Sequence, residues 1–125
     1  MSSLKVVSIE SVLLVDCNEI DNFINSKILE MNGVAEICVF TNPNKALLHL
    51  KETTVVYQHV FIDVYFPVID GIEFIEQFNK LELYKKQGEI IVLTASIDPI
   101  YKEKCKKMNV KYIEKPLTIE KFLTI

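Results

Sequence analysis

Cysteine is scarce in this chain, and no two cysteines are spaced to form a metal or redox motif. The three cysteines, Cys17, Cys38 and Cys105, are scattered over 125 residues, and no C-x-x-C pair occurs. An odd number of scattered cysteines argues against a disulfide framework and against a zinc site. We therefore expect a reducing, cytoplasmic setting for this protein.

Long apolar runs are also absent. Residues 1–10 have no apolar core of the kind found in a secretory signal peptide. No stretch approaches the length needed to cross a bilayer, and we find no internal repeat, low-complexity tract or linker. Because half of the 125 residues are apolar, the sequence predicts a single domain, residues 1–125, with its own hydrophobic core.

The charge pattern lacks the basic stripe of a nucleic-acid binder. The formal net charge is −3 at pH 7, so we expect no nucleic-acid binding by this domain. Five lysines cluster late in the chain, at Lys102, Lys104, Lys106, Lys107 and Lys111. We interpret this cluster as a solvated helix face, and a docking surface for an acidic partner is the alternative.

The chain does contain a regular alternation of strand-like and helix-like segments. Apolar runs predict buried strands over 12–15, 36–40, 59–63, 89–94 and 110–113. Helical spacing and cap residues predict helices over 19–31, 43–51, 72–81 and 98–107, with a short last helix from Thr118. We interpret 53–57 as a loop or a lead-in to the third strand. Five β–α units indicate an α/β protein whose parallel sheet has helices on both faces.

Polar side chains follow four of the predicted strands, at the point where each strand ends. Asp16 and Cys17 follow the first strand, Asp63 the third, Thr94 the fourth and Lys115 the fifth. In a doubly wound sheet these ends meet in one crevice. Two carboxylates, a hydroxyl and an ammonium in one pocket can handle a phosphoryl group. A carboxylate is then the nucleophile, and a divalent ion, the hydroxyl and the lysine neutralise the phosphoryl oxygens.

Four motifs at these strand ends, taken in order, resemble a known family. They are Leu14-Val15-Asp16 with Asn18-Glu19, Ile62-Asp63 with Pro67 and Asp70-Gly71, Leu93-Thr94-Ala95, and Glu114-Lys115-Pro116. Over nearly the whole chain, from Val12 to about Phe122, the sequence resembles the receiver domains of two-component response regulators, the CheY-like superfamily. The resemblance implies a flavodoxin-like, doubly wound (βα)5 three-layer sandwich with a five-stranded parallel sheet in the order 2-1-3-4-5.

The resemblance also implies a role for each polar residue. Asp63 resembles the phosphoacceptor, which takes a phosphoryl group from a sensor histidine kinase or a phosphotransfer protein. Thr94 resembles the switch hydroxyl that closes on the phosphoryl oxygens, and Lys115 resembles the lysine that pairs with the phosphoaspartate. Tyr112 matches the aromatic position whose ring turns inward when the hydroxyl moves. The peptide bond before Pro116 is expected to be cis.

Mg²⁺ is the cofactor that the resemblance implies, and one of its ligand positions is altered. Asp16 matches the first acid of the family's acidic pair, and Asp63 and the backbone carbonyl of Tyr65 match further ligands. The second acid is Cys17 here, and a neutral thiol is a poor ligand for a hard ion, so Mg²⁺ affinity should fall. We prefer a small, partly buried Cys17 over a redox-sensing thiol. Glu19 could replace the missing ligand, but a solvated first-turn acid is preferred.

The sequence therefore predicts a receiver domain, not an enzyme with a separate substrate. It would assist its own phosphorylation and dephosphorylation and switch a protein-interaction surface. The expected partners are a kinase or phosphotransfer protein and a downstream protein, with a homodimer through the fourth helix, fifth strand and last helix as an alternative. The rival is a pseudo-receiver, an interaction module with impaired phosphorylation, which Cys17 supports. A flavodoxin-like enzyme is disfavoured because no glycine-rich phosphate loop follows the first strand.

Overall fold

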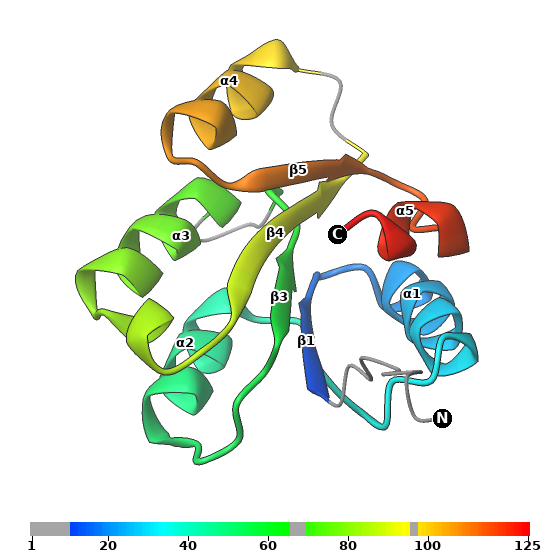
Figure 1. Cartoon of the computed structure of the whole chain (residues 1–125). Coiled ribbons are helices and arrows are strands. Elements are labelled where there is room, and N and C mark those ends of the chain that lie inside the picture. The colour runs from blue at the N-terminus through cyan, green and yellow to red at the C-terminus, as the bar shows by residue number, and fades with distance from the viewer. Residues whose placement is uncertain (1–10, 66–69, 96–97) are drawn as a thin grey trace, which may run out of the picture.

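A five-stranded parallel sheet forms the centre of the computed structural model, which describes residues 11–65, 70–95 and 98–125 (Figure 1). The strands are β1 (Ser11–Val15), β2 (Glu36–Phe40), β3 (His59–Ile62), β4 (Glu89–Thr94) and β5 (Lys111–Glu114). Their order is β2-β1-β3-β4-β5, and every neighbouring pair is parallel. The predicted doubly wound sheet and its strand order are confirmed.

The helices form a layer on each face of the sheet (Figure 1). Helices α1 (Glu19–Met31) and α5 (Ile119–Leu123) cover one face, and α2 (Pro43–Glu52), α3 (Gly71–Lys80) and α4 (Pro99–Lys107) lie on the other. The boundaries predicted for strands and helices agree with these to within one residue. The structure adds a short 3₁₀ helix, η1 (Leu83–Lys85), which the sequence patterns did not predict because it is too short to show a periodicity.

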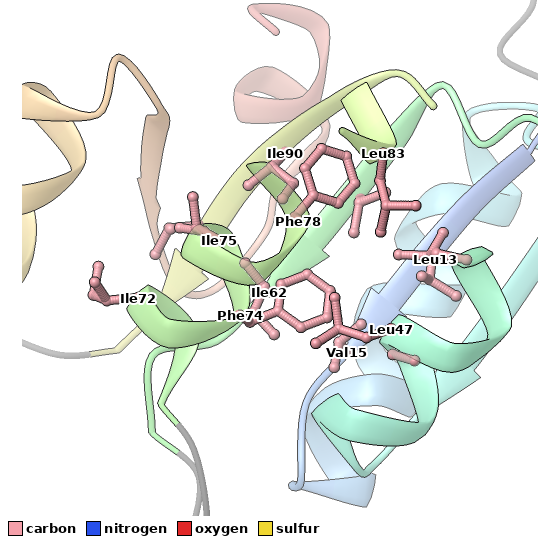
Figure 2. Packing of buried hydrophobic residues seen from close by; sticks show 14 of the residues in the cluster. Leu13, Val15, Leu47, Ile62, Ile72, Phe74, Ile75, Phe78, Leu83 and Ile90 are labelled. Carbon is pink, nitrogen blue, oxygen red and sulfur yellow. The ribbon is translucent and has the colours of Figure 1, made fainter. Parts of the chain in front are cut away.

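Side chains of the central strands alternate between two separate hydrophobic clusters. Leu13 and Val15 of β1 belong to the cluster beneath α2 and α3, whereas Val12 and Leu14 belong to the cluster beneath α1 and α5. This is the alternation expected of a strand that is buried on both faces. Figure 2 shows the first cluster, in which Phe74 and Phe78 of α3 pack toward the sheet.

Helix starts coincide with the side-chain caps that the sequence indicated. Asn42 caps α2, Asp70 caps α3, Asp98 caps α4 and Thr118 caps α5, each through a side-chain oxygen that accepts from a first-turn N–H. The segment 53–57 has no regular secondary structure, in agreement with its interpretation as a loop. These caps fix where each helix leaves the carboxyl edge of the sheet.

Helix α1 presents its apolar stripe to solvent. Ile20, Phe23 and Ile24 have the helical spacing of a buried face, yet they are 72%, 64% and 45% exposed. The buried face carries Asn22 and Asn25 together with Leu29. The Nδ2 of Asn22 donates to the backbone carbonyl of Asp16 at 2.7 Å, which satisfies a carbonyl at the end of β1. The helix is therefore oriented by a polar contact near the strand end.

Candidate functional site

Asp16 and Asp63 lie at neighbouring strand ends, where the connections of the sheet diverge. The chain leaves β1 toward β2 on one side and returns to β3 on the other, which makes this edge the switch point of the sheet. The backbone hydrogen bonding continues one residue past each strand. The N–H of Asp16 donates to the Phe40 carbonyl at 3.0 Å, and that of Asp63 donates to the Val15 carbonyl at 3.1 Å. Both carboxylates therefore project from a fixed backbone.

Gly71 lets the start of α3 pack directly on the backbone of Asp63. A Cβ at this position would lie 2.3 Å from the Asp63 carbonyl oxygen and 2.8 Å from the Cα of Val64. The Gly71 N–H donates to the Val64 carbonyl at 3.0 Å. The Asp70-Gly71 pair thus marks the turn into α3 as predicted, whereas Pro67 lies outside the described residues.

The carboxylate of Asp63 is buried and held on one side by three donors. Its Oδ1 accepts from the N–H of Val64 at 2.6 Å, from the N–H of Tyr65 at 3.3 Å and from the Thr94 hydroxyl at 2.6 Å. Asp63 is 7% exposed and Thr94 is fully buried. The hydroxyl predicted to act on Asp63 is therefore in direct contact with it.

Lys115 joins the carboxylates of the site. Its ammonium donates to Oδ2 of Asp16 at 2.6 Å, of Asp21 at 2.7 Å and of Asp63 at 2.7 Å. The Lys115 N–H donates to the Thr94 carbonyl at 2.9 Å, and the bond to Pro116 is cis as expected. The structure thus brings Asp16, Asp63, Thr94 and Lys115 into one contact network.

The electrostatics keep this lysine charged. Burial lowers the pKa of Lys115, but hydrogen bonds to Asp16, Asp21 and Asp63 outweigh it, so the pKa lies above its usual value. Burial raises the pKa of Asp16, although Lys115 opposes that shift. The network therefore carries a fixed cation beside the carboxylate of Asp63.

Asp21 is the site residue that sequence reasoning missed. It lies in the first turn of α1, where its N–H donates to the capping side chain of Asn18 and its carboxylate reaches Lys115. We considered Glu19 instead, and Glu19 is exposed. The sequence does show two acids in the first turn of α1, Glu19 and Asp21. Their spacing does not indicate which of the two side chains faces the strand ends.

Cys17 is exposed, which corrects the expectation of a partly buried side chain. Its Sγ lies 3.6 Å from the carbonyl oxygen of Tyr65, to which the thiol donates. Partial desolvation of the sulfur and then the charges of Asp16 and Asp63 raise the pKa of the thiol. Because reactive cysteines have a lowered pKa, this environment disfavours the redox-sensing alternative.

Tyr112 lies on the same face of the sheet as Thr94. It pairs with Val92 of β4, and Thr94 is two residues further along that strand. Since strand side chains alternate, Val92 and Thr94 point to one side, and half-buried Tyr112 is a diagonal neighbour of Thr94. The ring of Tyr65 is 51% exposed and packs edge-on against Tyr101, with 5.6 Å between the ring centres.

The oxygen atoms of the site suit a hard divalent cation. The carboxylates of Asp16 and Asp63 and the carbonyl of Tyr65 are the ligand types that Mg²⁺ prefers, and the protonated thiol of Cys17 is not. The three carboxylates around Lys115 show that the pocket accommodates positive charge. In the part of the chain that the structure describes, no group of three or more His, Cys, Asp or Glu side chains surrounds a common metal position.

Comparison with known proteins decides the family. The family model described as the response regulator receiver domain matches residues 12–125. The chain belongs to this family. The matched residues include the strand ends at which an acid, a hydroxyl and a lysine of this receiver domain meet. It also agrees with a part in two-component signalling, in which receiver domains interact with histidine kinases and downstream effectors.

Solved structures show the same fold over nearly the whole receiver domain. A two-component response regulator from Cytophaga hutchinsonii is 31% identical with a TM-score of 0.84, over 94% of this chain and 93% of that one. A Francisella response regulator receiver domain is 26% identical with a TM-score of 0.73, over 92% and 91%. The chemotaxis response regulator CheY4 of Vibrio cholerae, at 24% identity and a TM-score of 0.76 over 94% and 95%, shares the fold.

No helix in residues 11–65, 70–95 or 98–125 combines the length and the apolar character that a membrane span requires.

Proposed function

We propose that this receiver domain works in the cytoplasm and accepts a phosphoryl group on Asp63 from a phosphohistidine of a sensor kinase or phosphotransfer protein. The supporting observation is the contact network around one buried carboxylate. A hydroxyl lies 2.6 Å from Asp63 and an ammonium lies 2.7 Å from it. A structural acid at a strand end needs neither contact.

The residues have separate roles in the transfer. A carboxylate oxygen of Asp63 bonds to phosphorus while the bond from phosphorus to the histidine nitrogen breaks, and the imidazole leaves with the electron pair. The ammonium of Lys115 and the hydroxyl of Thr94 neutralise charge on the phosphoryl oxygens. Mg²⁺, held by Asp16, Asp63 and the Tyr65 carbonyl, would supply further neutralisation when bound. Cys17 adds no anionic ligand, so this domain needs more Mg²⁺ than an acid at position 17 would require.

Phosphorylation would act on the rest of the domain through Thr94. Its hydroxyl bonds the unmodified carboxylate, and a phosphoryl group would draw it to a new acceptor. Tyr112 repacks as the neighbouring hydroxyl moves, which changes the face formed by α4, β5 and α5. A downstream protein reads this face, and a homodimer through it is the alternative.

The exposed stripe of α1 supports docking of the phosphodonor protein beside Asp63. Ile20, Phe23 and Ile24 form an apolar patch on the helix whose Asp21 contacts Lys115. Apolar patches near a reactive group are typical of protein–protein contact surfaces. The rival pseudo-receiver rests on Cys17, but it does not account for the retained contacts of Thr94 and Lys115 with Asp63.

Incubation with acetyl phosphate and Mg²⁺, followed by intact-mass measurement, tests the proposal. We expect the mass of one added phosphoryl group in the native chain and none in Asp63→Asn, which keeps the shape of the side chain. Absence of the gain at high Mg²⁺, with the native fold retained, would establish the pseudo-receiver instead. A gain that persists in Asp63→Asn would show that another residue is the acceptor.

A further inference from the structure

A groove of about 1190 Å³ separates α3 from α4 on the face of the sheet opposite α1 and α5. It reaches the amino ends of β4 and β5, at Gly88 and Lys111, whereas Asp63 and Thr94 lie at the carboxyl edge. The groove stays open because α4 is mostly polar, with Cys105 as its one buried residue.

The lining combines apolar surface with lysines. Tyr84, which is 52% exposed, and the partly exposed Met108 and Val110 contribute the apolar surface. The charged side chains that line the groove are Lys102, Lys106, Lys107, Lys111, Glu89 and Glu103. The groove is therefore positive in a chain whose net charge is −3.

Two of these lysines remain available to a partner. Lys107 pairs with Glu103 at 3.9 Å, and Lys111 pairs with Glu89 at 3.2 Å. Within the described residues, Lys102 and Lys106 have no carboxylate partner. They are one helical turn apart, so both point to the same side of α4 and both line the groove.

The volume of the groove is close to that of a short helix. A helix about 10 Å across and 15 Å long, or roughly ten residues, has about the volume of the groove. Two helices form its walls, which is the arrangement in which an amphipathic helix binds through apolar residues spaced by three and four.

We propose that the groove between α3 and α4 binds an acidic amphipathic helix of a partner protein. The apolar side of that helix covers Tyr84 and Met108, and its carboxylates pair with Lys102 and Lys106. The proposed contacts use none of the groups that touch Asp63, so binding does not require phosphorylation.

A designed peptide tests this proposal. The probe is a fluorescein-labelled helix of about twelve residues with leucines at i, i+3, i+4 and i+7 and glutamates elsewhere. Fluorescence anisotropy should show saturable binding to the full chain. The double variant Lys102→Glu with Lys106→Glu should weaken binding roughly tenfold or more, because two contacts become repulsive. Lys104→Glu, an exposed position on α4 outside the groove, should change the affinity less than about twofold.

Several outcomes would overturn the proposal. One is equal weakening by Lys104→Glu, and another is equal binding of a scrambled peptide or of one with lysines for glutamates. Binding of a labelled single-stranded oligonucleotide at equal affinity would identify a nucleic-acid groove instead. Self-association that the double variant abolishes, without peptide binding, would assign the groove to a second copy. Thermal unfolding verifies that each variant keeps the native fold. Tyr84→Ser tests the apolar contact separately and should weaken peptide binding. Asp63→Asn should bind the peptide normally, so failure of phosphorylation and failure of the groove are distinguishable.

Discussion

At the scale of single residues, the exchange of an acid for Cys17 has the most direct consequence. Its thiol donates to the Tyr65 carbonyl, an oxygen that a bound Mg²⁺ would use. A carboxylate at position 17 would remove this competing donor and add an anionic ligand. Cys17→Asp should therefore bind Mg²⁺ more tightly, roughly tenfold. Isothermal titration calorimetry measures the Mg²⁺ affinity. Cys17→Ser adds no charge, so its Mg²⁺ affinity should stay near that of the native chain. Equal affinity in all three proteins would show that position 17 does not face the metal.

A second residue-scale prediction concerns His59 and pH. Burial lowers the pKa of His59, Glu89 raises it in part, and Lys111 lowers it further. The unfolded chain takes up a proton near pH 6.5 while the folded chain resists protonation. Above about pH 6.5, His59 is uncharged in both states and does not change the free energy of unfolding. Below that pH, the free energy of unfolding decreases as pH falls toward the pKa of His59 in the folded chain. His59→Gln should show a smaller decrease in melting temperature between pH 8 and pH 5.5. Parallel curves for the two proteins would refute this role.

At the scale of elements, the contact between α3 and the backbone of Asp63 leaves no room for an added side chain. Gly71→Ala places a methyl group 2.3 Å from the Asp63 carbonyl oxygen, so the helix must shift. We expect a loss of about 1–3 kcal/mol in the free energy of unfolding and slower phosphorylation. Gly33→Asn is the control. Gly33 has φ +85° with nothing within 4 Å, and asparagine tolerates that conformation at small cost. Urea unfolding measures the free energy of unfolding of both variants. An equal loss in Gly71→Ala and Gly33→Asn would contradict a close contact at Gly71.

The elements also show how far the sequence could predict this molecule. Cap residues, helical spacing and apolar runs predicted the bounds of the five strands and the first four helices to within one residue, because those signals are local. The orientation of α1 could not be predicted, since it depends on the contact between Asn22 and the Asp16 carbonyl across the strand end. Asp21 was missed for the same reason, because its role follows from the rotation of that helix. Asp63, Thr94 and Lys115 were predictable because strand ends converge whatever the helices do.

At the scale of the whole molecule, the two proposed binding surfaces lie on opposite sides of the sheet. The stripe of Ile20, Phe23 and Ile24 on α1 lies on one side of the sheet, and the groove beside α4 lies on the other. A phosphodonor on α1 and a partner helix in the groove could therefore bind together. Tyr112 is the residue that lines the groove and also neighbours Thr94. We therefore expect this ring to carry an influence of phosphorylation to the groove.

Fluorine NMR of the chain labelled with 3-fluorotyrosine can follow that ring. The resonance missing from Tyr112→Phe identifies Tyr112 among the five tyrosines. Acetyl phosphate with Mg²⁺ should shift this resonance in the native chain, because the Thr94 hydroxyl leaves its bond to Asp63 and the diagonal neighbour repacks. Thr94→Ala should still gain the phosphoryl mass while its Tyr112 resonance stays in place. A shift of the same size in Thr94→Ala would mean that the signal reaches β5 by another path, such as Lys115, which also contacts Asp63.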